Sequence, residues 1–202
     1  MIVTEINGET FMVHPEYTSF TSNDYIVMAI NNTNKTIIGG TKRTYHEFKG
    51  DDKKYIQATI SSYNGTFFDV FGYRGKTHLT SGEKKEGFTE ADPKTSYSIW
   101  DTRKNKILIL ICYEICFPED YYHLIGGDID LIVHLVGYPM YDRHQYKAWY
   151  ALQKALVKHF NVPLISSCGG NSDDPMNLTH IITPKMLNDV DQMGNFTERR
   201  IY

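Results

Sequence analysis

The sequence has 202 residues, with 21 Lys or Arg against 24 Asp or Glu, which gives a formal net charge of −3. This length fits one domain, residues 1–202, and is sufficient to bury a core. An acidic balance without a long basic run argues against nucleic acid or an anionic membrane as a partner.

The cysteines and the N-terminal residues indicate a reducing compartment. Cys112, Cys116 and Cys168 are odd in number and lack a framework spacing, so the sequence predicts free thiols. No apolar run reaches the length of a membrane span, and the first residues lack the regions of a signal peptide. We therefore expect a cytoplasmic protein. No histidine pair has the His-x-x-x-His spacing of metal ligands, and neither a metal nor a cofactor is expected.

The first predicted strand ends next to a carboxylate. Residues 10–13 form a short apolar run, and Pro15 makes continued regular structure improbable. Glu16 follows directly, where the ordinary alternative is a solvated loop carboxylate. A helix through residues 26–30 comes next, with residues 23–24 as its predicted cap.

The following strands lead to a lysine. A strand over residues 36–38 is predicted to close at the two glycines after it. Strands over residues 55–63 and 66–71 are joined by Asn64-Gly65, a strong hairpin signal. Lys76 then emerges in a glycine-containing loop, where most lysines are simply solvated. Residues 81–92 are polar and rich in glutamate, which predicts a surface loop.

The second half of the chain has the pattern of an α/β layered fold. A short strand pair is followed by helices and strands in alternation, which is typical of a parallel sheet covered by helices. The predicted strands are 98–100, 106–111, 131–136 and 162–168, and the predicted helices are 118–125 and 142–160.

Cys112 is the candidate nucleophile because it lies at the end of the apolar strand that includes residues 107–111. A thiol at such a turn, close to backbone N–H groups and a cation, can become reactive, although a free cysteine is more often only a small buried hydrophobe. Functional groups collect at the carboxyl ends of strands in α/β sheets, so Glu16, Lys76 and Cys112 could converge. The carboxylate would act as base, whereas the ammonium and the Tyr113 N–H would stabilise developing charge.

Three motifs in this order resemble those of the nitrilase superfamily of carbon–nitrogen hydrolases. They are His14-Pro15-Glu16, then Tyr73-Arg74-Gly75-Lys76-Thr77-His78-Leu79, then Ile111-Cys112-Tyr113-Glu114 with Phe117-Pro118-Glu119. The resemblance implies an α-β-β-α sandwich with a Glu-Lys-Cys triad. It also implies that Glu16 is the general base, Lys76 the stabiliser of the tetrahedral intermediate, and Cys112 the nucleophile that forms a thioester.

The resemblance implies further substrate-binding residues. Many members carry another glutamate between the lysine and cysteine motifs, and Glu83 is the best placed, with Glu86 as the alternative. The loop that begins at Gly137 looks like a pocket-shaping loop of aliphatic amidases, which makes Tyr138 a binding candidate beside Tyr113. Superfamily members commonly pair through surface helices, so a homo-oligomer is expected.

The sequence also departs from the family pattern. Cys116 and Val157 replace a usual arginine and a common glutamate, and the resemblance covers only residues 8–184. The family's first strand and first helix are expected to be absent. A missing inner strand would leave unpaired backbone groups, so other residues or a neighbouring subunit should fill the gap.

The expected function is therefore thiol-dependent hydrolysis of a non-peptide C–N bond, with a small-molecule amide or nitrile as substrate. The alternative is a non-catalytic nitrilase-like subunit that serves in binding or assembly. Close approach of the three side chains would favour the enzyme, whereas wide separation would favour the subunit.

Overall fold

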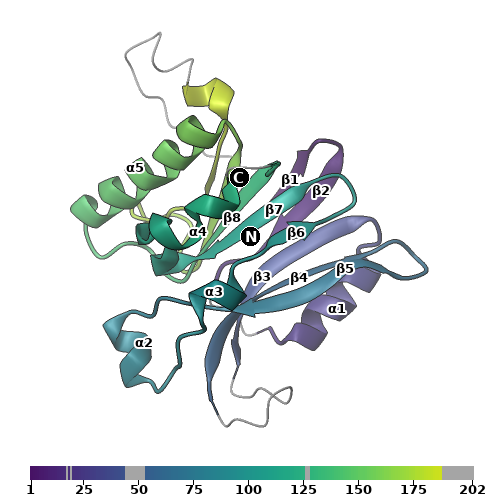
Figure 1. The fold of residues 1–202 in the computed structure, drawn as a ribbon, viewed down its shortest axis with the longest axis horizontal. Coiled ribbons are helices and arrows are strands. Elements are labelled where there is room, and N and C mark those ends of the chain that lie inside the picture. The colour runs from purple at the N-terminus through teal and green to yellow at the C-terminus, as the bar shows by residue number, and fades with distance from the viewer. Residues whose placement is uncertain (17, 19, 44–52, 126–127, 188–202) are drawn as a thin grey trace.

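The computed structural model describes residues 1–16, 18, 20–43, 53–125 and 128–187 (Figure 1). No helix among these residues is both long and apolar enough to cross a membrane. The elements in chain order are β1 Ile2–Ile6, β2 Glu9–Val13, α1 Ser22–Asn31, β3 Lys35–Arg43, β4 Tyr55–Tyr63, β5 Phe68–Gly75, α2 Ser81–Lys85, α3 Pro93–Ser96, β6 Ile99–Asp101, β7 Lys106–Ile111, a 3₁₀ helix Cys112–Cys116, α4 Pro118–Ile125, β8 Leu131–Val136, α5 Arg143–Phe160, β9 Leu164–Cys168 and β10 His180–Ile182.

The strands form two five-stranded mixed sheets, one from each half of the chain. The first has the order β1-β2-β3-β4-β5 and the second β10-β9-β8-β7-β6. β2 and β3 are parallel and are connected by α1, whereas β7, β8 and β9 are parallel and are connected by α4 and α5. This alternation confirms the α/β fold predicted from the second half of the sequence.

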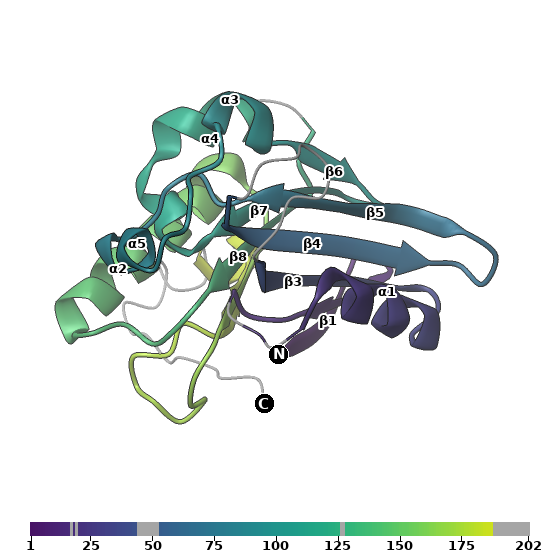
Figure 2. The ribbon, with the colours of Figure 1, turned by 90° about the horizontal axis from the view of Figure 1, so that it is seen from below.

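The two sheets pack face to face between layers of helix. Ile109 of β7 and Ile60 of β4 belong to the same buried cluster, which fills the space between the sheets. Leu108 and Leu110 point the other way and pack with residues of α4 and α5. The run of branched residues in β7 is therefore apolar because both of its faces are buried. Figure 2 shows α1 beside β3 and β4, on the side away from α4 and α5. The predicted α-β-β-α sandwich is confirmed.

The chain's own first residues cover the edge of β2. β1 pairs antiparallel with β2, from Ile2 opposite Val13 to Ile6 opposite Glu9. Asn7 and Gly8 join the two strands with φ values of 51° and 73°, as a two-residue hairpin turn requires. β2 is thus an inner strand with both edges paired. The expectation that other residues fill this position is met by β1, which the sequence reasoning did not anticipate.

Three predicted boundaries are wrong. β3 does not close at Gly39-Gly40 but continues to Arg43, and β5 runs on through Gly72 to Gly75. These strand positions are occupied by glycine because neighbouring groups leave no room for a side chain. A Cβ at Gly40 would lie 1.9 Å from the carbonyl oxygen of Glu16, and a Cβ at Gly72 would lie 2.3 Å from the Trp100 ring. The cap of α1 is also Thr21, not residues 23–24.

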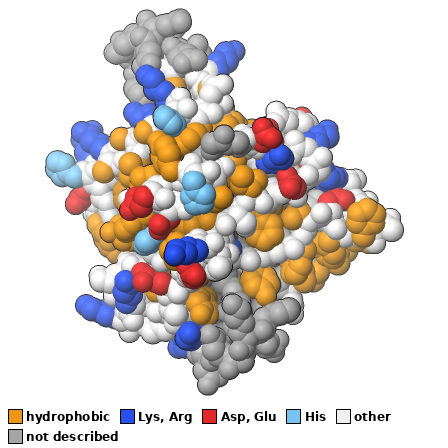
Figure 3. All heavy atoms as spheres, viewed as in Figure 1, with side chains coloured by type: hydrophobic (Ala, Val, Ile, Leu, Met, Phe, Trp, Pro, Cys, Tyr) orange, Lys and Arg blue, Asp and Glu red, His pale blue; other side chains and the backbone are white. Residues whose placement is uncertain are grey.

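Hydrophobic side chains are exposed at the far end of the first sheet. Figure 3 shows them along the right-hand side of the view, over the β4–β5 hairpin. Phe67 and Phe71 are exposed there, and Val27 of α1 is exposed as well. This end of the sandwich lies opposite the strand ends that carry Lys76 and Cys112.

Gly40→Ala tests the close contact between β3 and the segment after β2. The added methyl group has to displace backbone, so we expect a loss of stability of about 1–3 kcal/mol. Urea unfolding followed by circular dichroism measures it. Gly82→Ala is the matched control: nothing but the Thr80 hydroxyl lies near a Cβ there, and alanine favours helix, so stability should stay equal or rise. Equal stability of the two variants would contradict the packing described.

Candidate active site

Segments that follow three strands converge at one end of the sandwich. Lys76 directly follows β5, Cys112 directly follows β7, and Glu16 lies three residues after β2. The backbone N–H of Glu16 donates to the carbonyl oxygen of Val136 at 3.3 Å, and Gly169 N–H donates to the same oxygen at 3.0 Å. The first of these bonds connects the two sheets through their main chains, and the second extends the pairing of β8 with β9. The structure therefore brings together the three residues that the sequence motifs singled out.

Lys76 is a fully buried cation between two carboxylates. Its side chain has no exposed surface, and Nζ lies 2.6 Å from Glu16 Oε1 and 2.7 Å from Glu83 Oε1. A buried ammonium is tolerated only when it is paired and hydrogen-bonded in this way. Neither Glu16 nor Lys76 is the solvated loop residue that its segment alone would suggest.

Glu83 reaches Lys76 because residues 81–85 form α2. The prediction of a surface loop over residues 81–92 is wrong here, since a capping box begins the helix at Thr80. Glu83 Oε2 accepts from Thr80 N–H at 2.7 Å, and its other oxygen contacts Lys76. Glu83 is only 4 % exposed, whereas Glu86 is exposed at the end of α2. Of the two candidate glutamates, Glu83 is the one in the site.

Cys112 adopts a backbone conformation that is uncommon for a residue with a side chain. Its φ is 52°, in the left-handed region, at the start of the 3₁₀ helix. Such strain persists only where the surroundings impose it, and it often marks functional positions. The thiol accepts a hydrogen bond from Gly137 N–H and interacts with the Glu16 carboxyl.

The thiol and the carboxyl are both biased toward their neutral forms. Burial raises the pKa of Cys112 well above its usual value, and the Glu16 carboxylate adds to this effect. Burial also raises the pKa of Glu16 to about 7, against the opposing influence of Lys76. The Oε2 atom of Glu16 is buried without an ordinary hydrogen-bond partner among the described residues. A carboxyl with a pKa near neutrality is suited to accept and return a proton.

Lys76 keeps its charge in this environment. Burial alone would lower the pKa of its ammonium, but Glu16, Cys112 and Glu83 together outweigh burial and raise it. The ammonium is therefore a fixed positive charge beside the thiol. A fixed charge in a dry site can stabilise an anion without reorganisation.

A second buried ion pair fastens the lysine segment to the nucleophile turn. The Arg74 guanidinium pairs with the Glu114 carboxylate, and both side chains are almost fully buried. Glu114 also accepts from Thr77 N–H at 2.7 Å and from Ile111 N–H at 2.7 Å. One carboxylate thus holds the residues next to Lys76 and to Cys112. Arg74 and Glu114 lie within the quoted motifs, but the sequence reasoning assigned them no role.

His78 makes a further link between the same segments. Its ring stacks on Phe117 with centroids 3.7 Å apart and an interplanar angle of 8°. Its Nε2 pairs with the Asp120 carboxylate on α4. The loop that carries Lys76 is consequently held on both sides of the lysine.

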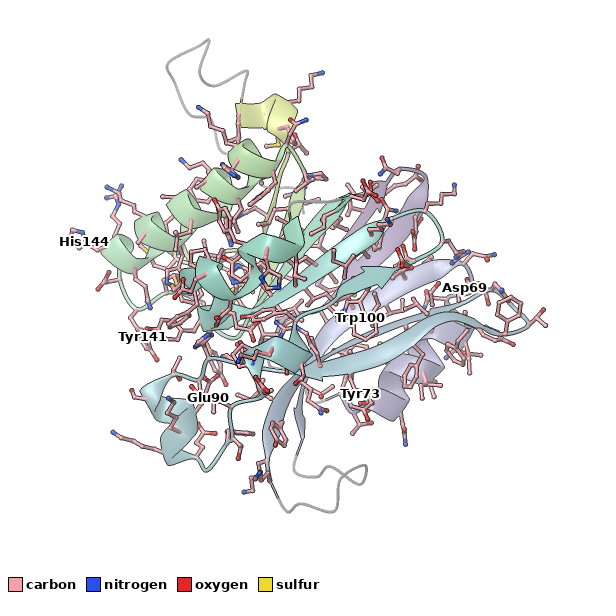
Figure 4. The ribbon with its side chains drawn as sticks, viewed as in Figure 1. Asp69, Tyr73, Glu90, Trp100, Tyr141 and His144 are labelled. Carbon is pink, nitrogen blue, oxygen red and sulfur yellow. The ribbon has the colours of Figure 1, made fainter. Side chains whose placement is uncertain are left out.

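The aromatic candidates differ in their exposure. Tyr113 is half-buried and packs edge-on against Phe117. Tyr138 follows Gly137 and is 60 % exposed. Tyr141 is 96 % exposed, and Figure 4 shows it with His144 near the start of α5, pointing outward. Tyr113 and Tyr138 each adjoin a residue of the site in sequence, whereas Tyr141 faces solvent.

A cleft of about 770 Å³ opens near the site but does not contain it. Tyr73, Trp100 and Glu90, labelled in Figure 4, line it together with Arg74. Glu16, Lys76 and Cys112 are not part of its lining. The cleft therefore reaches Arg74 but not these three side chains. No group of three or more His, Cys, Asp or Glu side chains in the described ranges could hold a metal ion.

The sequence matches no protein-family model and no curated protein. Solved structures are similar in fold. An amidase from Nesterenkonia sp. superposes with a TM-score of 0.66 at 13 % identity, over 86 % of this chain and 69 % of the amidase. A carbon–nitrogen hydrolase from Helicobacter pylori G27 gives 0.65 at 16 % identity, over 86 % and 66 %.

A third similar structure is a variant of the amidase from Nesterenkonia sp. AN1, whose active-site cysteine carries the acetamide moiety of fluoroacetamide. Its TM-score is 0.62 at 13 % identity, over 81 % of this chain and 58 % of that chain. The chain thus spans less than two thirds of that amidase. Another similar structure is of a further variant of this Nesterenkonia amidase, which belongs to the nitrilase superfamily. The chain has the α/β fold of nitrilase-superfamily amidases and carbon–nitrogen hydrolases.

Proposed function

We propose that the protein is a cysteine-dependent hydrolase that cleaves the C–N bond of a small-molecule amide. Cys112 is the nucleophile, Glu16 the general base and Lys76 the stabiliser of the anionic intermediate. One observation carries the proposal: a buried ammonium lies 2.6 Å from a carboxylate that also contacts the partly buried Cys112 thiol. This arrangement supplies the three functions that attack of a thiol on an amide requires.

In the first step, Cys112 Sγ attacks the amide carbon while Glu16 takes the thiol proton. A base is needed because burial keeps the thiol protonated at neutral pH. The C–S bond forms, and the carbonyl oxygen becomes an oxyanion. When the intermediate collapses, the C–N bond breaks and Glu16 returns the proton to the nitrogen. Ammonia or an amine leaves, and the acyl group remains on sulfur as a thioester.

In the second step, water attacks the thioester carbon and Glu16 takes a proton from it. Collapse breaks the C–S bond, releases the carboxylic acid and restores the thiol. Glu16 therefore accepts and returns one proton in each half-reaction. A carboxyl with a pKa of about 7 is suited to both directions.

Charge on the substrate oxygen is stabilised by two fixed donors. The Lys76 ammonium stays charged in its pair with Glu16 and Glu83, and the Tyr113 N–H lies at the strained nucleophile turn. Loss of a donor of this kind typically lowers kcat by about 10²–10³. Glu83 holds the ammonium in place and faces the bound amide, and Tyr138 borders the acyl group from the loop after β8.

The buried position of the reacting groups favours a short substrate. The amidase of similar fold has been seen with butyramide, which is consistent with this size. Short aliphatic amides are the leading candidates, and nitriles are the second group to test. One domain over residues 1–202, a cytoplasmic location and homo-oligomerisation stay predictions of the sequence.

Cys112→Ala should abolish turnover, because it removes the thiol that is hydrogen-bonded to the Glu16 carboxyl. Ammonia release is measured with a panel of short aliphatic amides, carbamoyl amino acids and nitriles. Iodoacetamide should label Cys112 faster than Cys116 or Cys168, as peptide mass spectrometry resolves. Cys116→Ala is the matched control and should keep its turnover. Equal labelling of the three thiols, or no ammonia from any compound, would favour the alternative of a non-catalytic subunit.

The rate should depend on pH through Glu16. Because burial raises the pKa of Glu16 to about 7, the base is protonated and inactive at pH 6 and ionised at pH 8. We expect kcat/KM for the best amide to rise with pH across this range, with a midpoint at about 7. A stopped-time assay in a constant-ionic-strength buffer series measures it. A flat profile from pH 5 to 8, as an ordinary glutamate would give, contradicts the assignment.

A further inference from the structure

A histidine interrupts the apolar strand β8. His134 is the one polar residue of Leu131–Val136, and it is fully buried. Its neighbours Ile132 and Val136 pack in the cluster beneath α4 and α5, so the histidine points to the same side. The Trp149 ring of α5 lies 5.8 Å from the imidazole. A buried histidine at such a position needs partners for both of its nitrogens.

Both nitrogens of His134 have partners. Nε2 lies 2.9 Å from the carbonyl oxygen of Cys112. Nδ1 lies 2.8 Å from Nε2 of Gln153 on α5. Gln153 Nε2 also donates to the Ser166 hydroxyl at 3.0 Å, and Gln153 Oε1 lies 2.7 Å from Nε2 of His180. A continuous buried chain therefore runs from the nucleophile turn through β8 and α5 to β10.

Only one tautomer of a neutral His134 satisfies this chain. A carbonyl oxygen can only accept, so His134 Nε2 must carry the proton that it donates to Cys112. Nδ1 must then accept, and Gln153 supplies the amide hydrogen. The Gln153 oxygen is left to accept from His180. This assignment follows from the fixed chemistry of the Cys112 carbonyl and holds the imidazole in one orientation.

The charge environment keeps His134 neutral. Burial lowers its pKa to about 4, against the favourable contact with the Cys112 carbonyl, and the Lys76 ammonium lowers it further. His180 is a second buried histidine whose pKa burial lowers to about 4. Lys76 is thus the charged group that acts on the pKa of His134, and His134 in turn lowers the pKa of His180. The hydrogen bond to Cys112 is present throughout the pH range of an ordinary assay.

The orientation of the Cys112 carbonyl also determines the orientation of the Tyr113 N–H. The carbonyl of Cys112 and the N–H of Tyr113 belong to one planar unit and point in opposite directions. Fixing the oxygen therefore fixes the direction of the N–H. The 52° φ of Cys112 is a strained conformation that needs such external support.

We propose that His134 is a positioning residue of the active site: it holds the Cys112 carbonyl and thereby aims the Tyr113 N–H at the substrate oxygen. Gln153 and His180 hold His134 in the tautomer that can do so. The inference rests on the proposed function, because the Tyr113 N–H has this role only if Cys112 attacks an amide. Neither His134 nor Gln153 lies in the motifs that suggested the reaction.

The test compares two substitutions by two readouts. His134→Phe keeps a ring but removes the donor, and kcat for the best amide should fall about 10- to 100-fold with KM little changed. His134→Gln places an amide N–H where Nε2 lies and should recover most of kcat. Alkylation of Cys112 by iodoacetamide forms no oxyanion, so its rate should be similar in both variants and the wild type.

Several results separate this inference from the proposed function. Without wild-type turnover, the proposed function and the inference both fail. With wild-type turnover, the inference alone fails if His134→Phe keeps full kcat, if His134→Gln is no better than His134→Phe, or if alkylation falls in parallel with kcat. Thr59→Val, a buried strand substitution in the other sheet, is the control and should leave both rates unchanged.

The wild-type protein offers a second measurement, in which a variant serves only to assign a signal. Nitrogen NMR of ¹⁵N-histidine-labelled protein distinguishes the tautomers of each imidazole. We expect the imidazole of His134 to be protonated at Nε2, to accept at Nδ1 and not to titrate between pH 5 and 8. The spectrum of His134→Gln assigns that signal. Protonation at Nδ1, or titration near pH 6.5, would overturn the inference.

Discussion

The structure depends on a buried positive charge. Lys76 has no exposed surface, and a solitary ammonium in such a place would lose a proton or unfold the region around it. It keeps its charge because Glu16 and Glu83 reach it from separate segments of the chain. The requirement therefore fixes where the loop after β2 and helix α2 must dock. The same pairing leaves Glu16 in contact with the Cys112 thiol, so a constraint on folding also assembles a reactive group.

Rigidity around this charge comes from the main chain and from buried polar side chains. The carbonyl oxygen of Val136 accepts hydrogen bonds from the N–H groups of Glu16 and Gly169. Glu16 lies in the segment after β2 of the first sheet, and Gly169 follows β9 of the second sheet. Glu114 holds the N–H groups of Thr77 and Ile111, so it couples the lysine segment to the turn at Cys112. Groups held in this way cost little reorganisation when charge develops during a reaction.

Much of the scaffold could be predicted from the sequence because its signals are local. The apolar runs of β7, β8 and β9 and the long helix α5 each carry their own pattern, and the motifs led to Glu16, Lys76 and Cys112. The parallel strands and their helices then place those motifs at one end of the sheets. Each of these features can be predicted from residues that are close together in the sequence.

Other features depend on contacts between distant segments. Position 40 of β3 has to be a glycine because the Glu16 backbone approaches it, and the burial of Glu83 depends on its contact with Lys76. The Asn7-Gly8 turn, by contrast, is a local hairpin signal. The pairing of His134 with Gln153 has no sequence signature beyond a histidine in an apolar strand, since the two residues meet across a strand and a helix.

The central claim is that Cys112 forms a thioester with the acyl group of an amide. The most direct measurement is peptide mass spectrometry of protein mixed with a short aliphatic amide and quenched in acid within the first turnovers. The account predicts one added acyl group on the peptide that contains Cys112, located on that thiol and absent from Cys112→Ala. An acyl group on Cys116 or Cys168 instead, or turnover without any acylated thiol, would contradict it.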